Sequence, residues 1–89
     1  MITEEEKDII KRCAEKYNVA EVFLFGSSLK NVEEANDIDL AIRRGIRSEL
    51  FFDFYGDLMF DLPKPVDVVD ASEPSRFINF IMRKAVKIC

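Results

Sequence analysis

Histidine is absent from this sequence of 89 residues, and only two cysteines occur. Because histidine is the commonest metal ligand and general base in proteins, its absence leaves carboxylates to supply any acid–base or metal chemistry. The two cysteines, Cys13 and Cys89, lack the spacing of a zinc site and make a poor disulfide framework. We expect both to be reduced, with Cys13 buried on the apolar side of a helix and Cys89 mobile.

Long apolar runs and an excess of basic residues are also missing. No segment approaches the roughly 20 apolar residues of a membrane span, and the opening MITEEEKD is acidic, unlike a signal peptide. The net charge is −4, so we expect no direct nucleic-acid partner. These features predict a single cytoplasmic domain over residues 1–89. To bind a polyphosphate, such an acidic domain would need divalent cations to mask the charge.

What the chain does contain is an alternation of helix-like and strand-like apolar patterns. The expected strands are at 21–25, 37–42, 66–70 and 85–89. The expected helices are at 4–17, 28–34 (a brief one) and about 48–61, with a last helix that has Phe77, Ile78, Ile81 and Met82 on its apolar face. This order predicts an α/β (α+β) fold with one sheet. Thr3 with Glu6 fits a capping box, Asn18 a left-handed stop, and Ser48 a cap of the second long helix.

Two acids lie one residue apart inside the second strand, in DIDLAI. In a strand, Asp37 and Asp39 point to the same face, roughly 6.5 Å apart along the chain. Ionised and unpaired carboxylates are costly to bury, and Mg²⁺ removes that cost because it prefers oxygen ligands. The alternative is a solvated strand end, and for an isolated pair of acids that alternative is the better one.

The pair is not isolated, because FGSS follows the preceding strand. Gly26 allows a ligand to approach the backbone closely. Ser27, at the start of a helix, offers its hydroxyl and backbone N–H groups to an anion. A plain turn with a serine cap is the alternative for Gly-Ser alone, but Gly-Ser on one strand and two acids on the next combine a phosphate cradle with a metal site.

A third acid is expected on a neighbouring strand, and VDVVD contains two. Asp67 is flanked by Val66 and Val68, where an acid needs a reason. Asp70 is the rival, but it falls at the strand end, where a solvated loop acid is the simpler explanation. We favour Asp67.

Gly26-Ser27, Asp37, Asp39 and Asp67 together resemble the nucleotidyltransferase superfamily of the DNA polymerase β type, and most closely its minimal (MNT) domains. The resemblance implies a mixed sheet of about four strands flanked by helices. It implies that the three aspartates are catalytic and hold two Mg²⁺ ions, with Asp67 helping to deprotonate the acceptor hydroxyl. Gly26, Ser27, Ser28 and Lys30 would contact the nucleotide. The implied reaction moves a nucleoside monophosphate, typically AMP from ATP, with release of pyrophosphate.

The resemblance also implies a partner. Minimal domains of this type often pair with a small helical HEPN protein, an RNase-like toxin, and act as its antitoxin. We therefore expect either transfer of AMP to that partner or, as the alternative, a non-catalytic antitoxin that masks the partner by contact, in a hetero- or homo-oligomer. Lys30 and Asn31 stand where many members have Arg and Gly. Lysine keeps the charge but loses the bidentate fork.

The predicted helix at 48–61 carries two further patterns. Asp53, Asp57 and Asp61 recur every four residues, which predicts a solvated face rather than a metal or partner patch. The phenylalanines at 51, 52, 54 and 60 exceed what one helix face can bury, so we expect some of them to form an exposed apolar interface.

Overall fold

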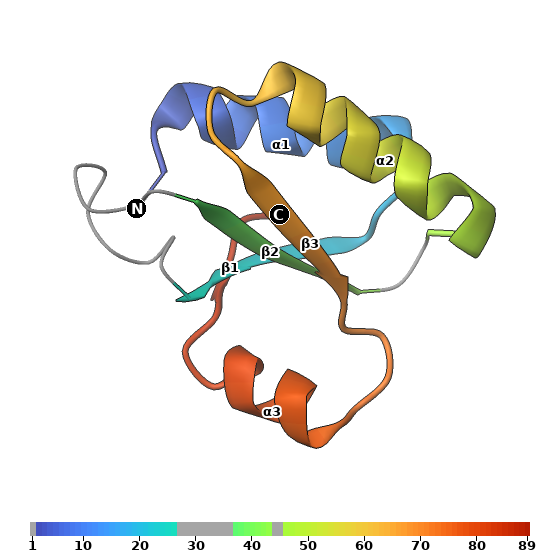
Figure 1. Ribbon diagram of the computed structural model, residues 1–89, viewed down its shortest axis with the longest axis vertical. Coiled ribbons are helices and arrows are strands. Elements are labelled where there is room, and N and C mark those ends of the chain that lie inside the picture. Colours follow the sequence, from blue (N-terminus) through green and yellow to red (C-terminus); the bar gives the residue numbers. More distant parts are fainter. Residues whose placement is uncertain (1, 27–36, 44–45) are drawn as a thin grey trace.

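The computed structural model describes residues 2–26, 37–43 and 46–89 of the chain. Three helices and four strands occur in this described part (Figure 1). Their bounds are α1 Glu4–Lys16, β1 Glu21–Phe25, β2 Ile38–Arg43, α2 Ser48–Asp61, β3 Val66–Asp70, α3 Arg76–Met82 and β4 Val86–Lys87. This order agrees with the predicted one. The brief helix expected at 28–34 lies outside the described residues.

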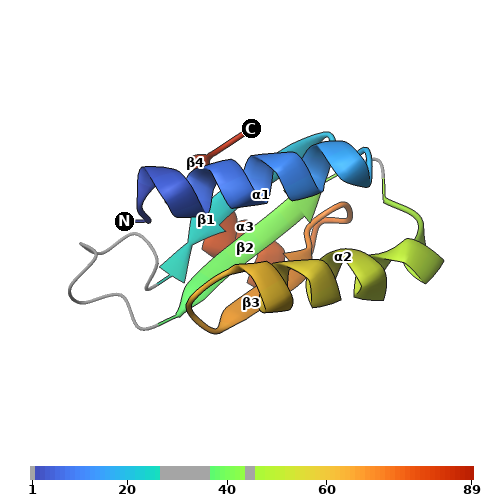
Figure 2. The same ribbon diagram turned by 90° about the horizontal axis from the view of Figure 1, so that it is seen from above.

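The four strands form one mixed sheet in the order β3-β2-β1-β4. β1 pairs antiparallel with both β2 and β4, whereas β2 and β3 run parallel. α1 and α2 lie on one face of the sheet, and α3 lies on the other face (Figures 1 and 2). The predicted fold, a mixed sheet of four strands flanked by helices, is confirmed.

The main hydrophobic core lies between the sheet and the pair of helices α1 and α2. Alternate residues of β2, namely Ile38, Leu40 and Ile42, are fully buried there because successive strand residues point to opposite faces. Phe54 and Leu58 of α2 pack against them and are also fully buried. Burying each such side chain contributes about 1.5–3 kcal/mol, so this face of β2 is held firmly. The residues between them must point to the opposite face.

A smaller apolar cluster lies on that opposite face, under α3. Its buried members are Ala41, Ala71 and Ile78. Phe77 is 56% exposed, so the prediction that it belongs to the buried side of the third helix is wrong. The physical reason is that Ile78, Ile81 and Met82 form the side of this seven-residue helix that packs against the cluster, and Phe77 does not belong to that side. This face of the sheet is therefore only partly covered by helix.

The ends of the helices test the predicted caps. In α1 the Glu6 N–H donates to Thr3 Oγ1 at 3.1 Å, and the Thr3 N–H donates to Glu6 Oε1 at 2.9 Å. The capping box is confirmed, and Asn18 has the predicted left-handed conformation with φ 56°. The predicted cap of α2 is wrong. Arg47 occupies the N-cap position without a side-chain cap bond, and Ser48 is the first helical residue.

Two strand ends also differ from expectation. β2 begins at Ile38, where the backbone N–H donates to Pro65 O at 2.9 Å. Asp37 therefore lies in the bend before the strand. At the other end of the chain, the carbonyl of Cys89, which we expected to be mobile, accepts a hydrogen bond from the Val22 N–H of β1 at 2.9 Å. Both cysteines are free thiols, and Cys13 is buried as predicted.

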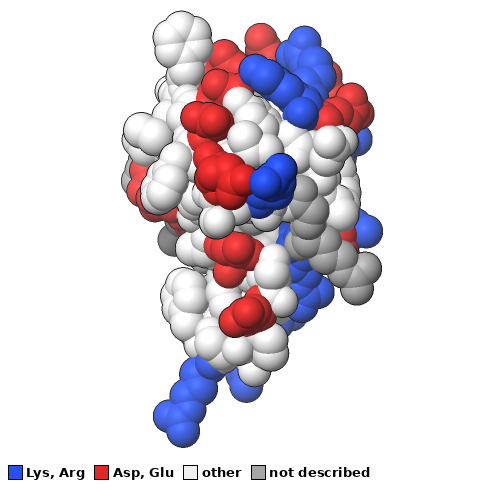
Figure 3. Space-filling view, turned by 90° about the vertical axis from the view of Figure 1, so that its right-hand side faces the viewer, with Lys and Arg blue, Asp and Glu red and all other residues white. Residues whose placement is uncertain are grey.

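The outer side of α2 carries exposed aromatic side chains, as the sequence predicts. Phe52 is 76% exposed and Phe60 is 90% exposed, and Met59 between them is 62% exposed. Acidic side chains gather on the face shown in Figure 3, where large uncharged side chains also stand out from the surface. Among the described residues, none of the helices has the length and apolar character that crossing a bilayer requires.

Candidate functional site

Asp39 and Asp67 occupy opposed positions on two neighbouring strands. In the parallel register of β2 and β3, Asp39 pairs with Asp67, and Leu40 pairs with Val68. Paired residues share a face of the sheet, so both carboxylates lie on the face opposite the main core. Asp39 is half-buried and Asp67 is exposed. The fold thus brings together two acids that are far apart in the sequence.

Gly26 lies directly against Asp39. The last residue of β1, Phe25, pairs with Asp39 in the antiparallel register, and Gly26 follows it with φ 64°. This left-handed conformation strains residues that carry a Cβ. A Cβ at this position would lie 2.6 Å from Asp39 Oδ2, which is closer than van der Waals contact allows. The backbone conformation therefore favours glycine at this position, and a Cβ here would displace the carboxylate of Asp39.

Asp67 has a contact that sequence reasoning missed. The Tyr55 hydroxyl, from α2, donates to Asp67 Oδ1 at 3.3 Å. Burial raises the pKa of Tyr55, and the negative charge of Asp67 raises it further. The hydroxyl thus stays protonated and orients one oxygen of the carboxylate. The sequence indicated Tyr55 only as an apolar member of its helix, and no local pattern links it to a strand further along the chain.

Asp67 is exposed, although the sequence predicts that an acid inside an apolar strand needs a special reason. The structure exposes Asp67 because β3 is an edge strand and Val66 and Val68 point to the other face. Its position opposite Asp39 therefore supports a role for Asp67 more strongly than its flanking valines do.

The remaining predicted acids lie in different places. Asp37 is half-buried in the bend two residues before Asp39. Asp70 pairs with Ile42 at the far end of β3, so it shares the face of the main core rather than that of Asp39. Its Oδ1 accepts the Ser72 N–H at 2.9 Å, as a carboxylate in a turn does. The catalytic roles of Asp37, Asp39 and Asp67 stay predictions.

Of the four residues predicted to contact the nucleotide, only Gly26 belongs to the described part of the chain. Ser27, Ser28 and Lys30 lie outside the described residues. Within the described ranges, no three acid or cysteine side chains converge as a metal-binding group. The potential metal ligands beside Gly26 are carboxylate oxygens, and oxygen is the ligand atom that Mg²⁺ prefers. The carboxylates of Asp39 and Asp67, which lie on paired positions of neighbouring strands, are therefore of the chemical type that could bind magnesium.

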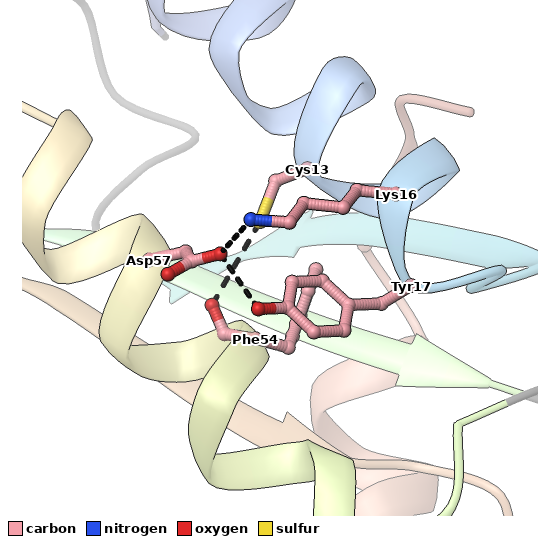
Figure 4. Close-up of polar contacts among 5 residues, drawn as sticks. All are labelled: Cys13, Lys16, Tyr17, Phe54 and Asp57. Carbon is pink, nitrogen blue, oxygen red and sulfur yellow. Dashed lines mark hydrogen bonds and ion pairs between the residues drawn. The ribbon is translucent and has the colours of Figure 1, made fainter.

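A second polar cluster joins α1 to α2 on the other side of the molecule (Figure 4). Asp57 Oδ2 accepts from Tyr17 Oη at 2.7 Å and from Lys16 Nζ at 2.9 Å. The hydrogen bond from Tyr17 is the largest cause that lowers the pKa of Asp57 below its usual value, and the hydrogen bond from Lys16 is the next. Asp57 is thus part of a helix–helix contact, and the prediction of a purely solvated acidic row is incomplete at this position.

Cys13 is a buried free thiol beside the same cluster. Its Sγ donates to Phe54 O at 3.8 Å (Figure 4). Burial is the largest cause that raises the pKa of this thiol to about 11, so it stays protonated at neutral pH. Nucleophilic chemistry needs a thiolate, so Cys13 is not a candidate nucleophile.

Comparison with known proteins identifies one matching family. The family model described as "Polymerase beta, Nucleotidyltransferase" matches residues 7–89. This range contains Gly26, Asp37, Asp39 and Asp67. No curated protein matches the chain significantly.

Proposed function

Because this chain belongs to the polymerase beta nucleotidyltransferase family, we propose that it transfers AMP from ATP to a hydroxyl group on a protein partner. The observation that carries the proposal is the pairing of Asp39 with Asp67 on parallel strands, with Gly26 against Asp39. In such a reaction the acceptor oxygen bonds to the α-phosphorus, and the bond from that phosphorus to the pyrophosphate oxygen breaks. The hydroxyl proton leaves toward a carboxylate.

In this proposal Asp37, Asp39 and Asp67 would hold two Mg²⁺ ions. When bound, such ions lower the pKa of a hydroxyl and offset the charge that develops in an in-line displacement. Asp67 is the proposed acceptor of the hydroxyl proton, because Tyr55 holds only its Oδ1. Gly26 has no side chain to hinder a phosphate, and Ser27, Ser28 and Lys30 are proposed to contact the phosphates.

The proposed partner is a HEPN-type toxin, and the proposed role is that of its antitoxin in the cytoplasm. The support for a protein partner is the exposed apolar side of α2, formed by Phe52, Met59 and Phe60. Exposed aromatic groups of this kind mark interaction surfaces more often than isolated apolar residues do. The same observation supports the second candidate, a non-catalytic antitoxin that masks its partner by contact.

Transfer of label separates the two candidates. The chain is incubated with Mg²⁺, the purified partner and ATP labelled either at the α- or at the γ-phosphate. Nucleotidyl transfer labels the partner from α-labelled ATP only, because the γ-phosphate leaves with pyrophosphate. Asp39→Asn and Asp67→Asn should abolish labelling, whereas Asp53→Asn, on the exposed side of α2, should not.

The opposite result supports the masking function. If wild-type protein leaves the partner unlabelled, and binding to the partner is equally tight for wild type and Asp39→Asn, then catalysis is not the basis of the interaction. Phe52→Ala should then weaken binding, because its ring belongs to the proposed contact surface.

A further inference from the structure

A mainly apolar pocket of about 510 Å³ lies between the end of β1 and the end of α3. Its lining consists of Phe25, Gly26, Phe80, Ile81, Arg83 and Lys84. In Figure 1, the segment that follows α3 runs back toward the end of β1. The volume lies within the range of about 300–1,000 Å³ that is usual for small-molecule sites.

This pocket adjoins the candidate site through one shared residue. Gly26 forms part of the pocket wall, and a Cβ on Gly26 would meet the carboxylate of Asp39. Gly26 thus lies between the pocket and the carboxylate of Asp39. A ligand that extends beyond the pocket on this side meets the carboxylates of the candidate site.

The lining combines two chemistries. Phe25 and Phe80 line the pocket, and Phe80 is 69% exposed, so much of this side chain is accessible to a ligand. Arg83 and Lys84 also line this pocket, and each carries a positive charge at the end of an exposed side chain. Aromatic rings stack with nucleobases, and Arg and Lys bind phosphate. A flat aromatic group attached to a polyphosphate satisfies both requirements.

We propose that this pocket receives the base of a nucleoside triphosphate, with Phe80 as the stacking ring and Arg83 and Lys84 as charge partners of the phosphates. The inference rests on the proposed nucleotidyl transfer and specifies where its nucleotide sits. An apolar side chain of a protein partner could fill the same space, but it would leave both cations without an anionic group. Charge complementarity and continuity with Asp39 therefore favour the nucleotide.

Binding of ATP can be compared with binding of inorganic tripolyphosphate, which lacks the base. Both affinities are measured by calorimetry in Mg²⁺ for wild type, Phe80→Ala and Phe77→Ala. Phe77 is the matched control, because it is exposed on the same helix but does not line the pocket. Loss of one stacking ring should weaken ATP roughly tenfold and leave tripolyphosphate unchanged. Phe77→Ala should change neither affinity by more than about twofold.

The result also separates this inference from the proposed function. If ATP binds to wild type, is lost in Asp39→Asn and is unaffected by Phe80→Ala, the base lies elsewhere while the nucleotide site remains. If wild type binds neither ATP nor tripolyphosphate, both proposals fail. If Phe80→Ala weakens ATP and tripolyphosphate equally, the ring does not contact the base and the inference is overturned.

Photocrosslinking locates the bound base of ATP directly. 8-Azido-ATP carries its reactive group on the base, and trypsin cuts after Arg76 and Arg83 to release the peptide 77–83. The adduct should be found on this peptide or on peptide 17–30, which contains Phe25, and excess ATP should suppress it. An ATP-suppressible adduct confined to any other peptide would refute the assignment.

Discussion

Gly26 and Gly56 should respond in opposite directions to the same substitution. Gly26 has φ 64°, and a left-handed conformation costs a residue with a Cβ about 1–2 kcal/mol. The Cβ would also lie 2.6 Å from Asp39 Oδ2, so the carboxylate must rotate away. Gly56 lies inside α2 and has no atom near its would-be Cβ, so alanine there should stabilise the helix by about 0.5–1 kcal/mol.

The two variants should therefore differ by about 1.5–3 kcal/mol in the free energy of unfolding. Urea denaturation measures this difference, and for a domain of this size the midpoint temperatures should differ by roughly 6 °C or more. Gly26→Ala should also weaken ATP binding in Mg²⁺ because it displaces Asp39, whereas Gly56→Ala should not. A Gly26→Ala protein as stable as wild type would refute the reasoning, and so would a Gly56→Ala protein clearly less stable than wild type.

Two further predictions concern the packing of α2. Phe54 is fully buried and Phe52 is 76% exposed, so Phe54→Ala should lower the free energy of unfolding by about 3–5 kcal/mol and Phe52→Ala by less than about 0.5 kcal/mol; equal effects in urea denaturation would contradict this core. The pKa of Asp57 is lowered by hydrogen bonds from Tyr17 and Lys16, so the stability from this carboxylate is present above its unfolded pKa and is lost as the pH falls through its folded pKa. Tyr17→Phe removes the larger cause and should raise the pKa of Asp57 in a carboxyl NMR titration, whereas an unchanged titration would show that the bond does not form.

Most of the secondary structure could be predicted because local interactions specify it. The apolar spacing of α1 and its capping box between Thr3 and Glu6 involve residues within one turn of each other. The alternation in β2 is likewise visible in consecutive residues. The predictions that were wrong concern positions where the local sequence is compatible with more than one structure. Ser48 is a good cap by type, but the chain enters α2 through Arg47.

The candidate site could be predicted only in part. Gly26, Asp39 and Asp67 are identifiable by residue type and order, because glycine and paired carboxylates have specific chemical uses. The contact of Tyr55 with Asp67 could not be predicted, because it depends on how α2 packs against an edge strand. The pocket formed by Phe80 and its neighbours depends in the same way on where α3 lies.

The sequence by itself thus determined the order of elements, the apolar faces and the residue types available for chemistry, since these follow from spacing and composition. Only the tertiary structure decided that Asp67 rather than Asp70 lies opposite Asp39. That choice depends on the register between two parallel strands, and the register is set by packing of Ile38, Leu40, Val66 and Val68 into one core. Shifting the register by one residue would turn the acids toward that core, and the cost of burying them there selects the observed pairing.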